Sequence, residues 1–176
     1  MPTGAKNVLI GGGVGGGKVL VWHLIENRWG GTEAAKFYKE AVTPALRKQY
    51  PGKRKFVILE DNDPTGNYSN AGVEAKEDGK MEPLIIPPRS PDLNVLDYAI
   101  WDEIERRMRL QEKKFPPSKV ESRAEFILRL GRVARNLPTK FIEDSIGDLA
   151  ERCQKLYAAK GGLFEEGGHK KRMRSF

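Results

Sequence analysis

The chain has 176 residues, of which 39% are hydrophobic and 31% are charged, a balance typical of one globular domain with a real hydrophobic core. No apolar run approaches the roughly 18 residues that a membrane-spanning helix needs, so we expect no membrane partner. The one cysteine excludes an internal disulfide, and two histidines are too few for a histidine-rich metal site. Lys and Arg number 31 against 24 Asp and Glu, and the net charge of +7 favours polyanionic partners such as nucleic acid.

Strands and helices are predicted to alternate along the chain, which indicates an α/β domain. Apolar and β-branched runs predict strands over residues 8–10, 19–25, 56–59 and 83–86. Helical spacing of apolar residues predicts helices over residues 33–47, 71–76, 96 to the break at Pro116, 119–136 and 139–159. Thr32 and Ser118 are expected to cap two of these helices. The run at 56–59, with charge on both sides, resembles a buried central strand.

The glycine-rich segment from Gly11 to Gly17 is predicted to join the first two strands as a hairpin connection. Gly12 to Lys18 also fits G-x-x-x-x-G-K, the start of a phosphate-binding P-loop. That loop needs a Ser or Thr after the lysine and then a helix, whose amide groups bind the phosphates. Val19 stands there instead and opens a strand-like run. A P-loop nucleotide binder is therefore only a remote alternative.

Two aspartates are the candidate catalytic and metal-binding residues. Asp61 follows the apolar run at 56–59, where a side chain leaves the core while rigid backbone fixes its position. Asp97 opens an amphipathic helix after a proline-stiffened loop. Carboxylate oxygens suit Mg²⁺ or Mn²⁺, and carboxylates on separate elements can share a metal pair. From the residues alone a structural interpretation stays open, because Asp61 also suits a turn and Asp97 suits a helix N-terminus.

The segments around these aspartates resemble the catalytic motifs of mariner-type DDE/D transposases. Residues 59–64 (L-E-D-N-D-P) resemble the family's Q-D-N-A-P, which carries the second catalytic aspartate. Residues 90–98 (S-P-D-L-N-V-L-D-Y) resemble S-P-D-L-x-P-x-D-Y, which carries the third. The spacing between the two aspartates is close to that of the family. The resemblance extends over roughly residues 17–165, including V-L-V-W at 19–22 and G-G at 161–162.

The resemblance implies an RNase H-like α/β fold, a mixed sheet flanked by helices with extra C-terminal helices, over residues 1–165. It implies metal-dependent cleavage and strand transfer of DNA as the ancestral activity, with Mg²⁺ or Mn²⁺ in a two-metal site and Asp61 and Asp97 as ligands. Asp92 would then belong to the loop that presents Asp97. DNA is the implied partner, with a second copy of this chain or a full-length transposase as further candidates.

The chain departs from the family pattern at the first catalytic carboxylate, because no aspartate precedes Asp61. The acidic residues upstream are Glu26, Glu33, Glu40 and Glu60, and none is a good replacement. The simplest interpretation is that residues 8–10 and 19–25 are the second and third strands, and that the central first strand is missing. Losing one carboxylate from a two-metal site removes most of the activity. Two hypotheses follow: an enzyme that obtains a third carboxylate elsewhere, or a non-catalytic remnant or domesticated module, which we favour for the chain alone.

Basic residues near the candidate site are candidate phosphate contacts, and a solvated helix face is the alternative interpretation. They are Arg89, Arg106, Arg107 and Arg109. Residues 166–176 form a basic tail that we expect to be disordered. The segment from Lys170 to Arg174 suits a nuclear localisation signal or a DNA-binding tail. We therefore expect a nuclear location in a eukaryotic cell and a cytoplasmic one otherwise.

Overall fold

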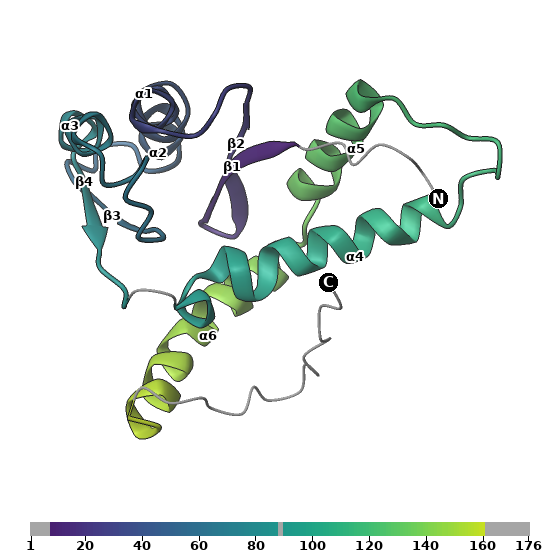
Figure 1. Ribbon diagram of the computed structural model, residues 1–176. Coiled ribbons are helices and arrows are strands. Elements are labelled where there is room, and N and C mark those ends of the chain that lie inside the picture. Colours follow the sequence, from purple (N-terminus) through teal and green to yellow (C-terminus); the bar gives the residue numbers. More distant parts are fainter. Residues whose placement is uncertain (1–7, 88–89, 161–176) are drawn as a thin grey trace.

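Four strands form two separate two-stranded sheets in the structure, a computed structural model that describes residues 8–87 and 90–160 (Figure 1). The strands are β1 (Leu9–Gly15), β2 (Lys18–Ile25), β3 (Phe56–Leu59) and β4 (Met81–Leu84). β1 and β2 pair as an antiparallel hairpin, whereas β3 and β4 run parallel. The parallel pair is joined through a crossover helix, as parallel strands require.

The predicted hairpin is confirmed, but the glycines contribute more to the strand than predicted. Only Gly16 and Gly17 form the turn, and both have the positive φ angles that glycine adopts without strain. The preceding glycines belong to β1 because aromatic rings lie directly against them. A Cβ atom would lie 2.5 Å from the Phe37 ring at Gly11 and 2.9 Å from the Trp101 ring at Gly12. The strand-turn-strand arrangement leaves no helix to bind phosphates, so the P-loop alternative is wrong.

Helices make up most of the remaining described chain. They are α1 (Gly31–Lys36), the π-helical segment η1 (Phe37–Val42), α2 (Thr43–Gln49), α3 (Asn70–Gly79), the 3-10 turn η2 (Pro91–Leu93), the π-helical segment η3 (Leu96–Ile100), α4 (Trp101–Glu112), α5 (Arg123–Arg135) and α6 (Thr139–Ala158). Within residues 8–87 and 90–160, none of them is long and apolar enough to cross a membrane.

Local hydrogen bonding moves several predicted boundaries. The predicted cap at Thr32 is wrong, because the helix begins at Gly31 without a side-chain cap. The helix predicted from residue 119 begins at Arg123 instead of following Ser118. Ser122 and Glu125 form a reciprocal capping box there, which satisfies two amide groups at the new start. β4 also begins two residues earlier than predicted, at Met81.

The β1–β2 hairpin lies between two helical layers (Figure 1). Val21 contacts one core cluster, which includes Tyr38 of η1 and Phe56 of β3. Trp22, the next residue, contacts the other cluster, which includes Ile104 of α4 and residues of α5 and α6. Because successive strand residues point to opposite faces, one hairpin serves both clusters.

Each sheet has two strands, so the outer edge of every strand is unpaired within the described ranges. The prediction that β3 is a buried central strand is therefore wrong in part. Phe56 is buried, but Val57 is 70% exposed, because no described strand or helix covers that side of β3. The absence of a central strand between the two sheets stays a prediction.

Candidate functional site

Asp61 lies two residues beyond the end of β3, on the carboxyl edge of the parallel sheet. The residue is exposed, yet its carboxyl accepts a hydrogen bond from the side-chain amide of Asn67, which is buried. Partial desolvation of the carboxyl and the nearby charge of Asp63 raise the pKa of Asp61, and the Asn67 bond offsets part of this rise. A bound cation would favour the charged carboxylate, so this site suits a divalent metal ligand.

A second aspartate, Asp63, organises the turn after β3 and has a structural role. Its carboxylate accepts hydrogen bonds from the Trp29 indole at 2.7 Å and from the Gly66 amide at 2.7 Å. Desolvation acts to raise the pKa of Asp63, but hydrogen bonds from Thr65, the Trp29 indole and the Gly66 amide together hold it below its ordinary value. The turn that carries Asp61 is thereby fixed to the helical layer of α1.

Asn62 connects the same turn to the neighbouring strand. Its side-chain amide donates to the carbonyl oxygen of Ile86, just beyond β4, at 2.6 Å. The ends of β3 and β4 are thus tied together at the edge from which the chain runs toward Asp97. The roles of Asn62 and Asn67 were missed in the sequence, although amide side chains in an aspartate-rich turn are a usable signal for such bonds.

Glu60, between β3 and Asp61, points into the core and is no substitute for the missing carboxylate. Its carboxylate pairs with Lys76 of α3 and accepts a hydrogen bond from the Tyr38 hydroxyl. The Lys76 side chain is 2% exposed, and its ammonium lies 4.6 Å from the centre of the Tyr68 ring. Burial, followed by the charge of Glu60, raises the pKa of Tyr38, so this phenol stays protonated.

Asp97 is exposed on the π-helical segment η3, which continues into α4. Its backbone amide bonds the carbonyl of Asn94 at 2.9 Å, which fixes the loop before it. Tyr98 anchors the segment from the other side, because its hydroxyl donates to the carbonyl of Ser145 in α6 at 2.5 Å. Burial raises the pKa of Tyr98 to about 12, so the hydroxyl remains a donor at neutral pH.

The two candidate ligands belong to different halves of the molecule. Asp61 follows β3, whereas the segment carrying Asp97 contacts β1 and α6. Within residues 8–87 and 90–160, no group of three or more His, Cys, Asp or Glu side chains is placed to hold a metal ion. Two exposed carboxylates offer hard oxygen donors that suit Mg²⁺ or Mn²⁺, but they leave the coordination sphere incomplete.

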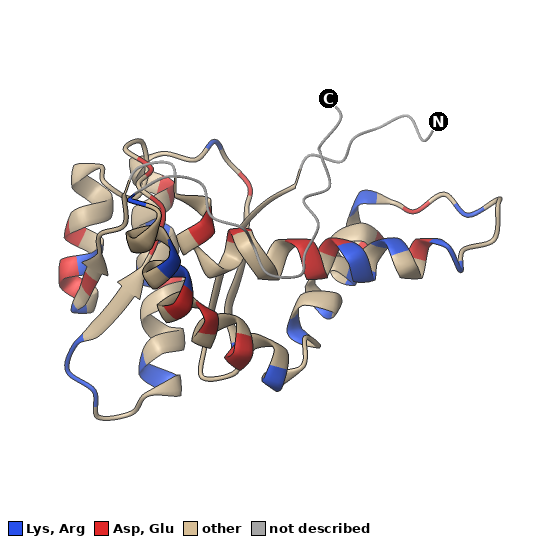
Figure 2. Cartoon of the chain, turned by 90° about the horizontal axis from the view of Figure 1, so that it is seen from below, with Lys and Arg blue, Asp and Glu red and all other residues tan. Residues whose placement is uncertain are grey.

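The arginines predicted as phosphate contacts are engaged on their own helix. The side chains of Arg106 and Arg107 both bond Glu103, at 2.6 and 2.7 Å, and Arg109 bonds Glu105 at 2.6 Å. Figure 2 shows acidic and basic residues interleaved along α4, as on a solvated helix face. Hydrogen bonds from Arg106 and Arg107 hold the pKa of Glu103 near 2, against the opposing effect of desolvation. Nucleic-acid binding by these arginines remains a prediction.

The other predicted elements of the site divide between described and undescribed residues. Asp92 lies in the 3-10 turn η2 before Asp97, and its backbone carbonyl accepts a hydrogen bond from Arg152 at 3.3 Å. The structural role of its side chain stays a prediction. Arg89 and the basic tail at 166–176 lie outside the described residues.

No family model and no curated protein matches the chain, but solved structures do. The Mos1 transposase catalytic domain with Raltegravir and Mg superimposes with a TM-score of 0.76 at 20% identity, over 90% of this chain and 77% of that one. The crystal structure of the catalytic domain of Mos1 mariner transposase gives 0.73 at 20% identity, over 90% and 76%.

A third similar structure is the Mos1 mariner paired end complex with Mn, with a TM-score of 0.71 at 20% identity. The match covers 85% of this chain but 42% of that one, so the chain corresponds to less than half of the Mos1 chain in the complex. The fold of this chain is that of a mariner-type DDE transposase catalytic domain, an RNase H-like α/β fold, as its motifs predicted.

Proposed function

We propose that this chain is a DNA-binding domain descended from a mariner-type DDE transposase, and that Asp61 and Asp97 are its divalent-metal ligands. One observation carries the proposal: the fold of the Mos1 catalytic domain occurs together with the two aspartate motifs, in order and at the expected elements. Asp61 follows the first strand of the parallel pair, and Asp97 opens the long helix. Similar Mos1 structures contain Mg, Mn or paired transposon ends, which supports DNA and a divalent metal as ligands here.

The residues of the chain define what the site contributes to chemistry. A divalent ion held there would activate a water or 3′-hydroxyl for attack on a phosphodiester. The turn fixed by Asn62 and Asp63 aims the Asp61 carboxylate, while the Tyr98 anchor fixes the segment that carries Asp97. Because Glu60 and Asp63 already serve the fold, the candidate ligands within residues 8–87 and 90–160 are Asp61 and Asp97. We therefore infer DNA binding without efficient cleavage for the isolated chain.

A second candidate function is a nuclease completed by another polypeptide. The unpaired outer edges of the two sheets, within the described ranges, favour it, because they offer backbone groups that an added strand can pair with. A strand carrying an acidic residue between the two halves would bring a third carboxylate to the side of Asp61 and Asp97. We rank this function second because it needs a component beyond the chain itself.

Nicking of supercoiled plasmid in Mn²⁺ distinguishes the two functions. We compare the purified folded chain with a variant carrying Asp61→Asn and Asp97→Asn, which preserves side-chain size. For a binding domain we expect DNA binding by mobility shift in both proteins and no nicking above the variant. Nicking that disappears in the variant would contradict the binding-only function and support the second candidate. Absence of duplex binding at low salt would contradict the primary proposal.

A further inference from the structure

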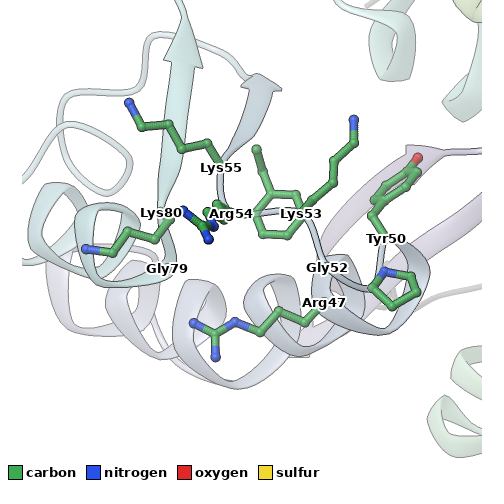
Figure 3. Close-up of a pocket in the computed structure, with 10 residues that line it drawn as sticks. Arg47, Tyr50, Gly52, Lys53, Arg54, Lys55, Gly79 and Lys80 are labelled. Atoms are coloured by element: carbon green, nitrogen blue, oxygen red, sulfur yellow. The ribbon is translucent and has the colours of Figure 1, made fainter.

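Five basic side chains surround a hollow at the amino edge of the β3–β4 sheet, the edge opposite Asp61 (Figure 3). The basic hollow is lined by Arg47, Lys53, Arg54, Lys55 and Lys80. Arg47 comes from the last turn of α2, the next three from the loop entering β3, and Lys80 from the turn between α3 and β4. The hollow is open to solvent and has a volume of about 880 Å³.

The cations of the basic hollow have no ion-pair partners within the described ranges, although Glu77, Asp78 and Glu82 lie near Lys80 in the sequence. Residues 47–55 contain five Lys or Arg and no Asp or Glu. Among the residues that the structure describes, none of the five lining cations forms an ion pair with a carboxylate. All five are exposed. This contrasts with the arginines of α4, which are bound to glutamates of the same helix.

Helix electrostatics explain only part of this arrangement. A cation in the last turn of a helix is favoured by the helix dipole, which accounts for Arg47. The loop cations, Lys53 to Lys55, lie outside any helix. Lys80 has a φ of 59°, in the left-handed region where glycine is the usual residue after a helix. Lys80 thus adds a fifth cation to the hollow at a position where glycine would suit the backbone better.

We propose that the basic hollow binds phosphate groups of double-stranded DNA, forming a contact separate from the metal-ligand edge. The proposal rests on the DNA-binding function above. Five flexible cations from three segments, spread around an open hollow, suit a polyanion with many phosphates better than one enclosed small anion. Lys55 and Asp61 stand at opposite ends of one strand, on the order of 20 Å apart at about 3.3 Å per residue. That separation exceeds the Debye length of about 8 Å at physiological salt, so the two edges act independently.

The test measures binding of a 30-bp duplex of arbitrary sequence by fluorescence anisotropy over a range of salt concentrations. One variant replaces all five lining cations with glutamine: Arg47→Gln, Lys53→Gln, Arg54→Gln, Lys55→Gln and Lys80→Gln. The matched control removes five exposed cations elsewhere: Lys36→Gln, Lys113→Gln, Lys114→Gln, Arg123→Gln and Arg132→Gln. Both variants carry the same net charge, so any difference between them reports the position of the cations.

We expect the hollow variant to bind at least about 10-fold more weakly than the parent near 0.1 M salt. The slope of log affinity against log salt should fall by about 0.9 for each phosphate that the variant no longer neutralises. The affinity of the control should fall by less than about 3-fold. Equal reductions in the two variants, or no reduction in the hollow variant, would overturn the inference while leaving the proposed function in place. A parent chain that binds no duplex at low salt would overturn both.

A variant with two substitutions tests whether misfolding causes the weaker binding. Lys53→Glu with Lys55→Glu changes only exposed residues next to β3 and reverses two charges. Its midpoint of thermal unfolding should match that of the parent. Its affinity for the duplex should fall by a factor similar to that of the variant with five glutamine substitutions. Unchanged affinity in this folded variant would also overturn the inference.

Discussion

The two ends of the β3–β4 sheet differ in charge and in how that charge is used. At the carboxyl end, Glu60 and Asp63 are bound within the fold, the first by Lys76 and the second by Trp29 and the backbone. Asp61 remains exposed between them. At the amino end, the cations of the basic hollow have no carboxylate partners among the described residues. At the carboxyl end, Glu60 and Asp63 thus stabilise the turn that carries Asp61. At the amino end, the cations of the basic hollow are available to bind an external anion.

Two clusters of like charge in one sequence can therefore have different functions. The acidic run at 60–63 looks like a metal site but mostly holds the turn together. The basic run at 47–55 looks like an ordinary solvated loop, yet nothing within the described chain neutralises it. The two runs differ in whether their side chains have bonding partners within the fold, and composition alone does not reveal this difference.

The largest expected effect comes from breaking the support at the carboxyl end. Replacing Lys76 with Met leaves the buried Glu60 carboxylate without its partner, which should cost about 3–5 kcal/mol of unfolding free energy. Urea unfolding measures this change. The matched control is Lys39→Met, because the exposed Lys39–Asp78 pair contributes only about 0–1 kcal/mol. Adding Glu60→Gln to Lys76→Met should recover part of the stability, and a Lys76 variant as stable as the control would contradict this account.

A smaller effect is expected from loosening the turn itself. Trp29→Phe keeps the ring but removes the indole donor to the Asp63 carboxylate, a bond to a charged group that contributes about 1.5–3 kcal/mol. We expect lower stability together with weaker Mn²⁺ binding, measured by thermal unfolding with and without the ion. Trp22→Phe, at the opposite face of the hairpin, serves as the control for ring size. If the stability fell but the Mn²⁺-dependent shift in unfolding temperature did not change, the turn would not contribute to metal binding by Asp61.

At the amino end, Lys80→Gly should raise the stability of the protein and lower its affinity for DNA. Glycine adopts the left-handed conformation freely, so relief of strain should stabilise the protein by about 1 kcal/mol. The same change removes one cation from the basic hollow, so duplex affinity should fall. Lys80→Asn, which tolerates this conformation, checks whether backbone relief is the cause. Stability and affinity that rise together would argue against a role for the charge.

The smallest effect is a pH-dependent one at Asp61. The pKa of this carboxyl is raised in the folded state, so its ionisation destabilises the fold, and stability is lost as pH rises through the folded pKa. Asp61→Asn should match the parent below about pH 3.9, where the unfolded aspartate is protonated, and should exceed it above the folded pKa by less than about 1 kcal/mol. Thermal unfolding between pH 3 and 7 measures the difference. Without metal, a variant less stable than the parent at neutral pH would contradict this prediction.

Sequence periodicity predicted the order and type of the main elements, and the two aspartate motifs predicted where each candidate ligand would lie. Boundaries failed where a single local bond decides them, as at Ser122, whose capping box fixes the start of α5. The prediction that the glycine run is a connection failed for another reason. Gly11 and Gly12 are strand residues against which aromatic rings from distant helices pack. No short-range pattern encodes those contacts. The basic hollow was also missed, since Arg47 and Lys80 meet only after the crossover between β3 and β4 is folded.

The π-helical turn at residues 96–100 determines how the Asp97 carboxylate is aimed relative to the helix that follows. A π turn contains about one more residue than an α turn, and such turns occur often at functional sites. Deletion of one residue between Asp97 and α4 would rotate the Asp97 carboxylate by about 100° around the helix axis. Ile104 and Met108 would keep their packing in the core. In this chain, therefore, the direction of the ligand and the burial of α4 can change separately during evolution, through a change in length instead of a change in side chains.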